Sequence, residues 1–361
     1  MNSMSDTREN RRFARRLYLN LSALQSFPYS NPNRDKNGAP KGHLYGGTWR
    51  QVMTSQCFKK ANRDYFATWF DDETLRTSDT VPYLIERVME EGNINAAEAE
   101  KYVLKFTKPS KAFGKEGKGE NNMFYSKEQF DGIVDLVVQS FKEDRKNVSK
   151  ESLKEFRNRI SAFPSATQVL FGRMIALDKD LAYDGATQYA DAFTVNEAIL
   201  EPDMFVVVSD PIREGERRRG GGFLDTRLGA SGTYYRYANV NLSEGSELFR
   251  HENLSAAKVC AQFVEAFVKS VPSGMIHSHA HCTIPDRLLV ELRDAPVNYC
   301  PAFEKAIVSN QGYAKEASLR LDEYKAGVDR IYGEPIAQWD MNELSLNEIK
   351  RQIEEEIERR T

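Results

Sequence analysis

The chain has 361 residues, of which 40% are hydrophobic and 29% charged, and its formal net charge is −3. This length and balance are typical of a soluble globular protein with a large core. No apolar run approaches the roughly 20 residues of a membrane-spanning helix. The net charge argues against a uniformly basic nucleic-acid binder, so any polyanion site must come from a local concentration of charge.

The cysteines indicate the compartment. Cys57, Cys260, Cys282 and Cys300 are widely spaced and form no CxxC pair. This pattern favours reduced thiols in a cytosolic protein, and residues 1–16 lack the apolar core of a signal peptide. We therefore expect a cytoplasmic location without membrane association.

The first predicted elements are a strand and a basic segment. Residues 16–23 alternate in the manner of a strand, and residues 56–66 predict a helix. Between residues 30 and 63, seven cations stand against one acid, among several glycines. Lys59 and Arg63 are four apart and share a helix face. Glycines, cations and a helix start suit phosphate oxygens, although a solvated surface loop explains the same residues equally well.

The next region, from about residue 71 to 166, has helical spacing of its apolar residues. The predicted helices are 81–89, 96–106 and 127–141. A Lys/Gly-rich piece at 108–119 has little apolar content and predicts an exposed loop. We interpret the whole region as a mostly helical insertion.

The second half of the chain predicts alternating helices and strands. Two helices are expected at 165–174 and 186–200, followed by a β-rich run at 204–209 and a strand at 233–242. A polar, glycine-rich loop joins these last two segments. Ser255 is a candidate N-cap for another helix, and the remaining elements are a strand at 287–292 and helices at 301–308, 314–324 and 346–359. The order is compatible with a βαββαβ ferredoxin-like core.

Several motifs, in this order along the chain, resemble the CasC family, the backbone (crRNA-binding) subunit of the type I-E CRISPR Cascade complex. The motifs are Asn-Arg-Asp at 33–35, Lys41, Tyr-Gly-Gly at 45–47, Ser-Gln-Cys-Phe-Lys-Lys at 55–60, Phe-Gly-Arg-Met at 171–174 and the aromatic strand at 231–242, with a weaker echo at 302–306 and 312–313. Together they extend over most of the chain.

The resemblance implies an α+β protein with the shape of a hand. Its palm would be an RRM-like (ferredoxin-like) domain made of residues 1–61, 166–199 and 233–361. The fingers would be the helical insertion at 62–165. The thumb would be a protruding β-hairpin at 200–232.

The resemblance also implies which residues hold the backbone of CRISPR RNA. Carried over motif by motif, they are Arg34, Lys41, Ser55, Gln56 and Lys59, with Thr54 and Arg63 as neighbours. Contacts to phosphate position RNA without reading its sequence, which suits a protein that must accept any guide.

Met174 and Phe205 are implied to act as apolar wedges that kink the guide between stretches of nucleotides. Without the resemblance, a core methionine and a packed strand aromatic are the simpler interpretations. The arginine-rich segment 213–219 is expected to cross a kinked guide position and to reach the adjacent subunit.

The function implied by the resemblance is that of a non-catalytic scaffold in antiviral defence. Several copies would polymerise along crRNA as a helical filament within a ribonucleoprotein. The kinked guide would then pair with target DNA. Its partners would be further copies of itself and the large, small and guide-end-capping Cascade subunits. No cofactor is expected.

Two other functions remain open at this stage. His277, His279 and His281 alternate, which would suit a metal-dependent nuclease or hydrolase, although a straight strand spreads such ligands ~6–7 Å apart. No GxxxxGK[ST] loop or nucleophile motif accompanies them. The other possibility is an RRM-like RNA chaperone that acts alone, without stepwise assembly.

Overall fold

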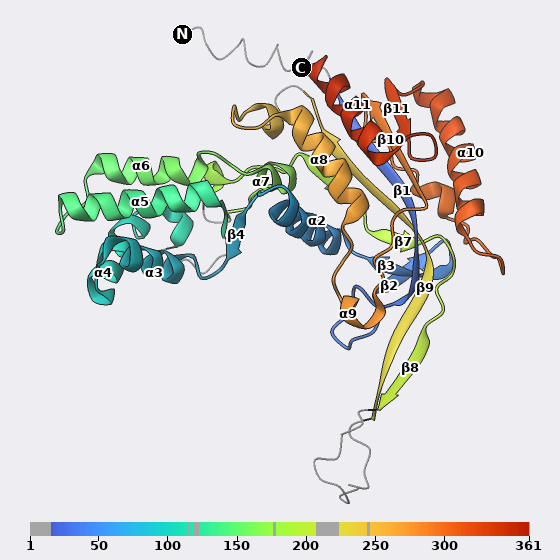
Figure 1. Ribbon diagram of the computed structural model, residues 1–361, viewed down its shortest axis with the longest axis horizontal. Coiled ribbons are helices and arrows are strands. Elements are labelled where there is room, and N and C mark those ends of the chain that lie inside the picture. Colours follow the sequence, from blue (N-terminus) through green and yellow to red (C-terminus); the bar gives the residue numbers. More distant parts are fainter. Residues whose placement is uncertain are drawn as a thin grey trace, which may run out of the picture.

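The computed structural model describes residues 16–114, 116–117, 123–175, 178–206, 224–243 and 246–360. Figure 1 shows a large sheet with helices packed on it, a group of helices that extends to one side, and a two-stranded arm that projects away. We call these parts the palm, the fingers (residues 74–161) and the thumb hairpin (β8 and the first part of β9).

The palm sheet has the strand order β11-β10-β1-β9-β7-β3-β2, and β6 also pairs with β9. All paired strands are antiparallel. The strands are β1 (Tyr18–Ser30), β2 (Gly42–Tyr45), β3 (Thr48–Met53), β6 (Thr187–Tyr189), β7 (Ala192–Thr194), β9 (Leu224–Asn241), β10 (Arg287–Arg293) and β11 (Ala337–Asp340). The predicted strands at 16–23, 233–242 and 287–292 are confirmed within β1, β9 and β10.

Three helices cover one face of this sheet: α2 (Ser55–Trp69), α8 (Ala256–Lys269) and α11 (Leu346–Glu358). Leu19 and Leu21 of β1 lie in one core with Phe66 of α2 and Phe263 of α8. Burial of such side chains is the main favourable term in folding. Ser255 caps α8 as predicted, because its hydroxyl oxygen accepts the N–H of Lys258.

The opposite face is covered by a 3-10 turn, η4 (Cys300–Phe303), and by α10 (Ala314–Tyr332). Tyr235 and Tyr237 of β9 are buried here in one core with Phe303 and Leu321. The Tyr235 hydroxyl accepts the N–H of Tyr299 at 2.9 Å. The aromatic strand therefore faces protein on this side of the sheet.

The fingers have a hydrophobic core of their own. It is built from α3 (Thr80–Gly92), α4 (Ala96–Thr107), α5 (Lys127–Glu143), α6 (Lys150–Ser161) and the hairpin of β4 (Thr74–Thr77) and β5 (Met123–Ser126). Ser126 and Gln129 form a capping box at the start of α5. The three helices predicted in this region are confirmed. The expected boundary at residue 62 falls within α2, whose Phe66 belongs to the palm core.

The short helix α7 (Ala166–Phe171) connects the fingers to the palm through hydrogen bonds. The carboxylate of Asp72 accepts the backbone N–H groups of Ala166 and Thr167 at 2.9 and 2.8 Å. The side chain of Gln168 donates to the carbonyl of Phe124 at 2.8 Å. The β4–β5 hairpin is thus held in place at the base of the fingers.

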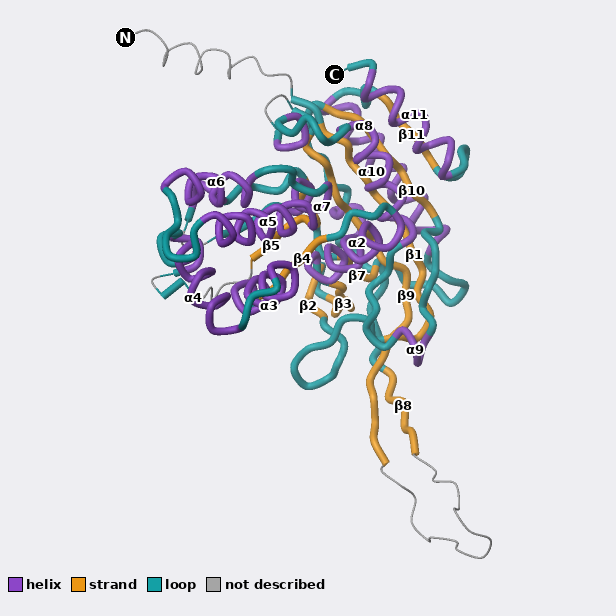
Figure 2. Tube along the Cα trace, turned by 60° about the vertical axis from the view of Figure 1, so that its left-hand side comes forward, coloured by secondary structure: helices purple, strands orange, loops and turns teal. Residues whose placement is uncertain are grey.

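The thumb hairpin pairs β8 (Glu201–Val206) with the start of β9, in a register from Glu201↔Gly229 to Val206↔Leu224. Figures 1 and 2 show it extending well beyond the palm sheet. The arginine-rich segment 213–219 lies outside the described residues.

Two predicted helices are wrong. Residues 186–200 form β6, β7 and a loop, because β-branched and aromatic residues such as Thr187, Phe193 and Thr194 pair with β9. Residues 301–308 form only the turn η4, since the N–H of Ile307 donates to the carbonyl of Val195 instead of continuing a helix.

Other differences concern element ends and short strands. The hairpin of β2 and β3 lies within the basic segment, where no strand was expected. The helix expected at 165–174 ends at Phe171, and α10 continues to Tyr332. No helix in the described part of the chain is long and apolar enough to cross a bilayer. All four cysteines are free thiols.

Candidate nucleic-acid interface

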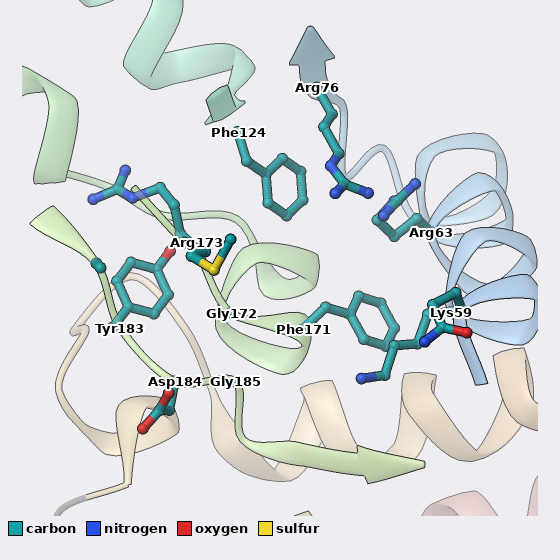
Figure 3. A pocket seen from close by; sticks show the side chains of 13 residues that line it. Lys59, Arg63, Arg76, Phe124, Phe171, Gly172, Arg173, Tyr183, Asp184 and Gly185 are labelled. Atoms are coloured by element: carbon teal, nitrogen blue, oxygen red, sulfur yellow. The ribbon is translucent and has the colours of Figure 1, made fainter. Parts of the chain in front are cut away.

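A groove of about 740 Å³ lies between α2, the base of the fingers and the loop after α7 (Figure 3). Four of the residues assigned to RNA from the sequence line it: Gln56, Lys59, Arg63 and Met174. The other lining residues are Arg76, Phe124, Phe171, Gly172, Arg173, Ala182, Tyr183, Asp184 and Gly185. Lys59 and Arg63 therefore lie on one surface, as their four-residue spacing predicted, and Gln56 of the same helix also lines the groove.

Three cations of the groove have no ion-pair partner within the described part of the chain. Among the residues that the structure describes, no carboxylate pairs with Lys59, Arg63 or Arg76, and Asp64 on the same helix pairs with Lys60 at 2.6 Å instead. The Lys59 ammonium lies 5.7 Å from the centre of the Tyr189 ring. The groove therefore holds three cations that form no ion pair with a described carboxylate, although Asp184 also lines it.

Burial makes this charge costly in the free protein. Burial lowers the pKa of Lys59 below its ordinary value. Burial also lowers the pKa of Arg63, and the nearby positive charge of Arg76 lowers it further. Because desolvation and like charge both oppose the protonated forms, an anion in the groove would be stabilised by all three cations.

Met174 reaches the groove because of the two residues before it. Gly172 ends α7 with φ +79°, and a Cβ there would meet the backbone nitrogen of Gly185 at 2.6 Å. Arg173 is buried, and its guanidinium donates to the carbonyls of Leu181 and Ile160 at 2.9 and 2.5 Å. With its neighbours fixed, Met174 is 83% exposed, which excludes the interpretation as a core methionine.

A second hollow contains Lys41 and Thr54, near the start of α2. The backbone N–H and hydroxyl of Thr54 donate to the Asn33 amide oxygen at 2.9 and 3.0 Å. The N–H of Ser55 donates to the carboxylate of Asp191 at 2.7 Å. One of the helix-start donors that we assigned to phosphate thus already has a negatively charged partner.

Arg34 has an exposed side chain, in the loop that leads to this second hollow. Its backbone forms an isolated bridge with Pro40. Asp35, beside it, accepts the N–H groups of Asn37 and Ala39 at 2.8 and 2.9 Å, which fixes the turn. The loop therefore presents Arg34 and Lys41 from an ordered backbone.

Phe205 lines a different hollow, at the base of the thumb hairpin. The Arg227 guanidinium lies 4.2 Å from the centre of its ring, and Tyr29 and His279 form an edge-to-face pair nearby at 5.4 Å. The two wedge residues of the sequence analysis, Met174 and Phe205, thus line separate hollows of the chain.

The three histidines of the metal hypothesis do not lie on one face of a strand. His277 and His279 are in the short helix α9 (Ile276–His279), and His279 packs on Tyr29. His281 is fully buried and donates from Nε2 to the carbonyl of Pro272 at 2.9 Å. The described residues contain no group of three or more side chains able to hold a metal ion.

One cation of the basic segment is structural. Arg50 is fully buried, and it donates to the carbonyls of Thr194, Phe303 and Glu304 at 2.8, 3.1 and 3.1 Å. Burial lowers its pKa. Counting charges along residues 30–63 therefore overstates the charge available to a ligand.

Arg76 and Phe124 are two of the lining residues that the sequence did not indicate. They are partners in the β4–β5 hairpin and come from distant parts of the chain. A short alternating run such as Thr74–Thr77 gives a weak strand signal, and nothing local indicates its partner. Only the fold brings them beside Arg63.

The palm, fingers, thumb hairpin and basic groove define the same class of protein as subunits of CRISPR RNA-guided surveillance complexes. A chain of a "CRISPR RNA-guided surveillance complex, pre-nicking" superposes with a TM-score of 0.76 at 28% identity, over 88% of this chain and 90% of that one. A chain of a second "CRISPR RNA-guided surveillance complex" superposes with a TM-score of 0.66 at 25% identity, over 90% of each chain.

The chain belongs to the CT1975-like protein family, which it matches over residues 19–359. No curated protein gives a significant sequence match. The family match and the two structures confirm the resemblance to CasC that the motifs indicated.

Proposed function

We propose that the protein is a non-catalytic backbone subunit of a type I-E Cascade complex, and that its groove holds the phosphate backbone of crRNA. The observation that carries this proposal is the convergence of Lys59, Arg63 and Arg76, none of them paired with a carboxylate of the described residues, beside the exposed Met174. Cations bind phosphates of any sequence, and an exposed apolar side chain can insert between bases.

The proposed palm is RRM-like (ferredoxin-like). In support, α2 lies between β1 and β7 in the chain, after the β2–β3 hairpin, α8 lies between β9 and β10, and the central strand order is β10-β1-β9-β7. An RRM usually stacks bases on exposed sheet aromatics, but here Tyr235 and Tyr237 are buried. RNA would therefore lie in the groove and not on the sheet.

The assembly is also part of the proposal. Copies of the chain would follow one another along crRNA as a helical filament, because a head-to-tail contact repeats until it is capped. The large, small and guide-end-capping Cascade subunits would complete the ribonucleoprotein. The guide would read target DNA by base pairing, with the thumb hairpin reaching the next copy.

Catalysis by this chain is not part of the proposal, and neither is a cofactor. The metal-dependent alternative required His277, His279 and His281 to converge on one ion. The inward position of His281 removes the geometric support for that arrangement. Cleavage of bound RNA or DNA by the purified chain, abolished by chelation, would restore the alternative.

The proposal is tested by measuring RNA affinity across salt concentrations for two unrelated guides of equal length. Lys59→Ala should lower the affinity for both guides by about tenfold, as expected for the loss of one charge-assisted contact. The slope of log affinity against log salt should fall in magnitude by about 0.7. The control is Lys315→Ala, an exposed lysine on α10, which should bind like the unchanged protein. Loss of binding to only one guide would contradict contact with the backbone.

A further inference from the structure

Arg76 has a position that the family resemblance did not assign to RNA. It lies on β4, at the base of the fingers, directly opposite Phe124 of β5 in the hairpin register. Both residues line the groove. The fingers therefore contribute a cation and an aromatic ring to a site whose other cations come from the palm.

Arg63 approaches Arg76 from the palm side. Figure 3 shows the Arg63 and Arg76 side chains pointing toward one another at one wall of the groove, with the Phe124 ring beside them. The Arg63 guanidinium lies 5.9 Å from the centre of that ring. The positive charge of Arg76 also disfavours the protonated form of Arg63 and lowers its pKa. Two like charges that converge, neither of them paired with a carboxylate that the structure describes, leave a place for an anion.

The backbone beneath Arg76 is fixed to the palm. Asp72 precedes β4 and accepts two backbone N–H groups from the start of α7. Gln168 of α7 donates to the carbonyl of Phe124. Because these contacts hold the hairpin at the groove, Arg76 is presented in place before any ligand arrives, which limits the entropy lost on binding.

We propose that Arg63 and Arg76 form a two-arginine clamp that holds a single phosphate group between a palm helix and a finger strand. The clamp deepens the proposed function, on which it rests, by assigning one nucleic-acid phosphate to a site shared by palm and fingers. Planar guanidinium groups suit this task because each can donate two parallel hydrogen bonds to phosphate oxygens.

A double-mutant cycle on RNA affinity tests the clamp. Arg63→Ala and Arg76→Ala should each weaken binding by about tenfold. The RNA affinity of the double variant should fall by only about 20-fold, because removal of the second arginine affects a phosphate whose contact with the clamp is already broken. Arg145→Ala is the matched control, because Arg145 lies on the fingers 5.3 Å from the Phe141 ring and outside the groove. It should bind RNA like the unchanged protein.

The salt dependence separates a phosphate contact from a merely structural role. Arg76→Ala should lower the salt slope by about 0.7, and the double variant should lower it no further. If the RNA affinity of the double variant fell by the full product of the two single losses, the two arginines would not share one phosphate, and the clamp would be overturned. Normal RNA affinity of Arg76→Ala would also overturn it. If Lys59→Ala still weakened binding in either case, the proposed function would stand without the clamp.

Discussion

Two regions of this molecule use arginine in opposite ways. In the interior of the palm, Arg236 lies between the rings of Phe58 and Phe267, at 4.2 and 4.4 Å, and donates to the carbonyl of Phe267 at 2.7 Å. In the groove, the Arg63 and Arg76 side chains point toward one another (Figure 3), and among the residues that the structure describes neither guanidinium has a hydrogen-bond acceptor. A guanidinium whose acceptors belong to the fold is structural, whereas converging cations without acceptors form a site for a ligand.

The largest effect is expected at Arg236. Burial lowers its pKa to about 9, so it stays charged at neutral pH. Arg236→Ala should lower the free energy of unfolding by about 3–5 kcal/mol, because it empties the space between two rings and leaves the buried amide oxygen of Gln25 without its donor. Denaturant unfolding measures this loss. Arg76→Ala should change the free energy of unfolding by less than about 0.5 kcal/mol. Equal losses of stability in the two variants would contradict the distinction between a structural and a ligand-binding arginine.

Glu265 extends the comparison from arginines to lysines, because two lysines of the palm pair with its carboxylate. Burial alone would raise its pKa from 4.5, but hydrogen bonds from Lys269, Lys350 and Tyr65 outweigh burial and hold the pKa at about 2. Since the folded pKa is depressed, its contribution is complete above about pH 4.5 and is lost as the pH falls toward 2. Glu265→Gln should cost about 2 kcal/mol at pH 7. It should also flatten the acid limb of a stability–pH curve, and an unchanged limb would contradict the paired network.

Lys59, unlike Lys269 and Lys350, has no described carboxylate partner, and burial lowers its pKa. It should therefore lose its proton, and its attraction for phosphate, at lower pH than an exposed lysine. We expect RNA affinity to fall as the pH rises from about 7 toward the ordinary lysine pKa of about 10.4, by up to about tenfold. Lys59→Arg should remove this decline, since arginine stays charged. Anisotropy titrations of both proteins measure it, and parallel curves would assign the decline to another group.

The smallest effect on affinity is expected at Met174, because its side chain is exposed and makes no charged contact. Met174→Ala should leave stability within about 0.5 kcal/mol and lower RNA affinity by less than about threefold. If Met174 separates neighbouring bases, the variant should reduce the fluorescence of a 2-aminopurine placed at the kink, because the probe is restacked. An unchanged signal at every probe position would contradict the wedge.

The sequence predicted the elements whose pattern is local. The capped helix after Ser255, the finger helices and the long aromatic strand all follow from spacing within one segment. The prediction of a helix at residues 186–200 was wrong because the structure of this segment depends on pairing with β9, a strand distant in the sequence. A segment that contains Thr187 and Phe193 has propensity for a strand, but the helical interpretation ignored it.

The same distinction applies to the groove. Lys59 and Arg63 were found because a helix places residues four apart on one face. Arg76 and Phe124 were missed because their proximity depends on the β4–β5 pairing. Arg50 was counted with the free cations because a sequence does not show that three backbone carbonyls surround its guanidinium. Charge is visible in the sequence, but the acceptors of that charge are a property of the fold.

The most direct test of the central claim is the mass and nucleic-acid content of the protein co-expressed with a CRISPR array and the other Cascade subunits. The account predicts a ribonucleoprotein with several copies of the chain on each crRNA, and loss of those copies when Lys59, Arg63 and Arg76 are replaced together by alanine. A free monomer without RNA would contradict it, as would particles whose RNA content is unchanged in the triple variant.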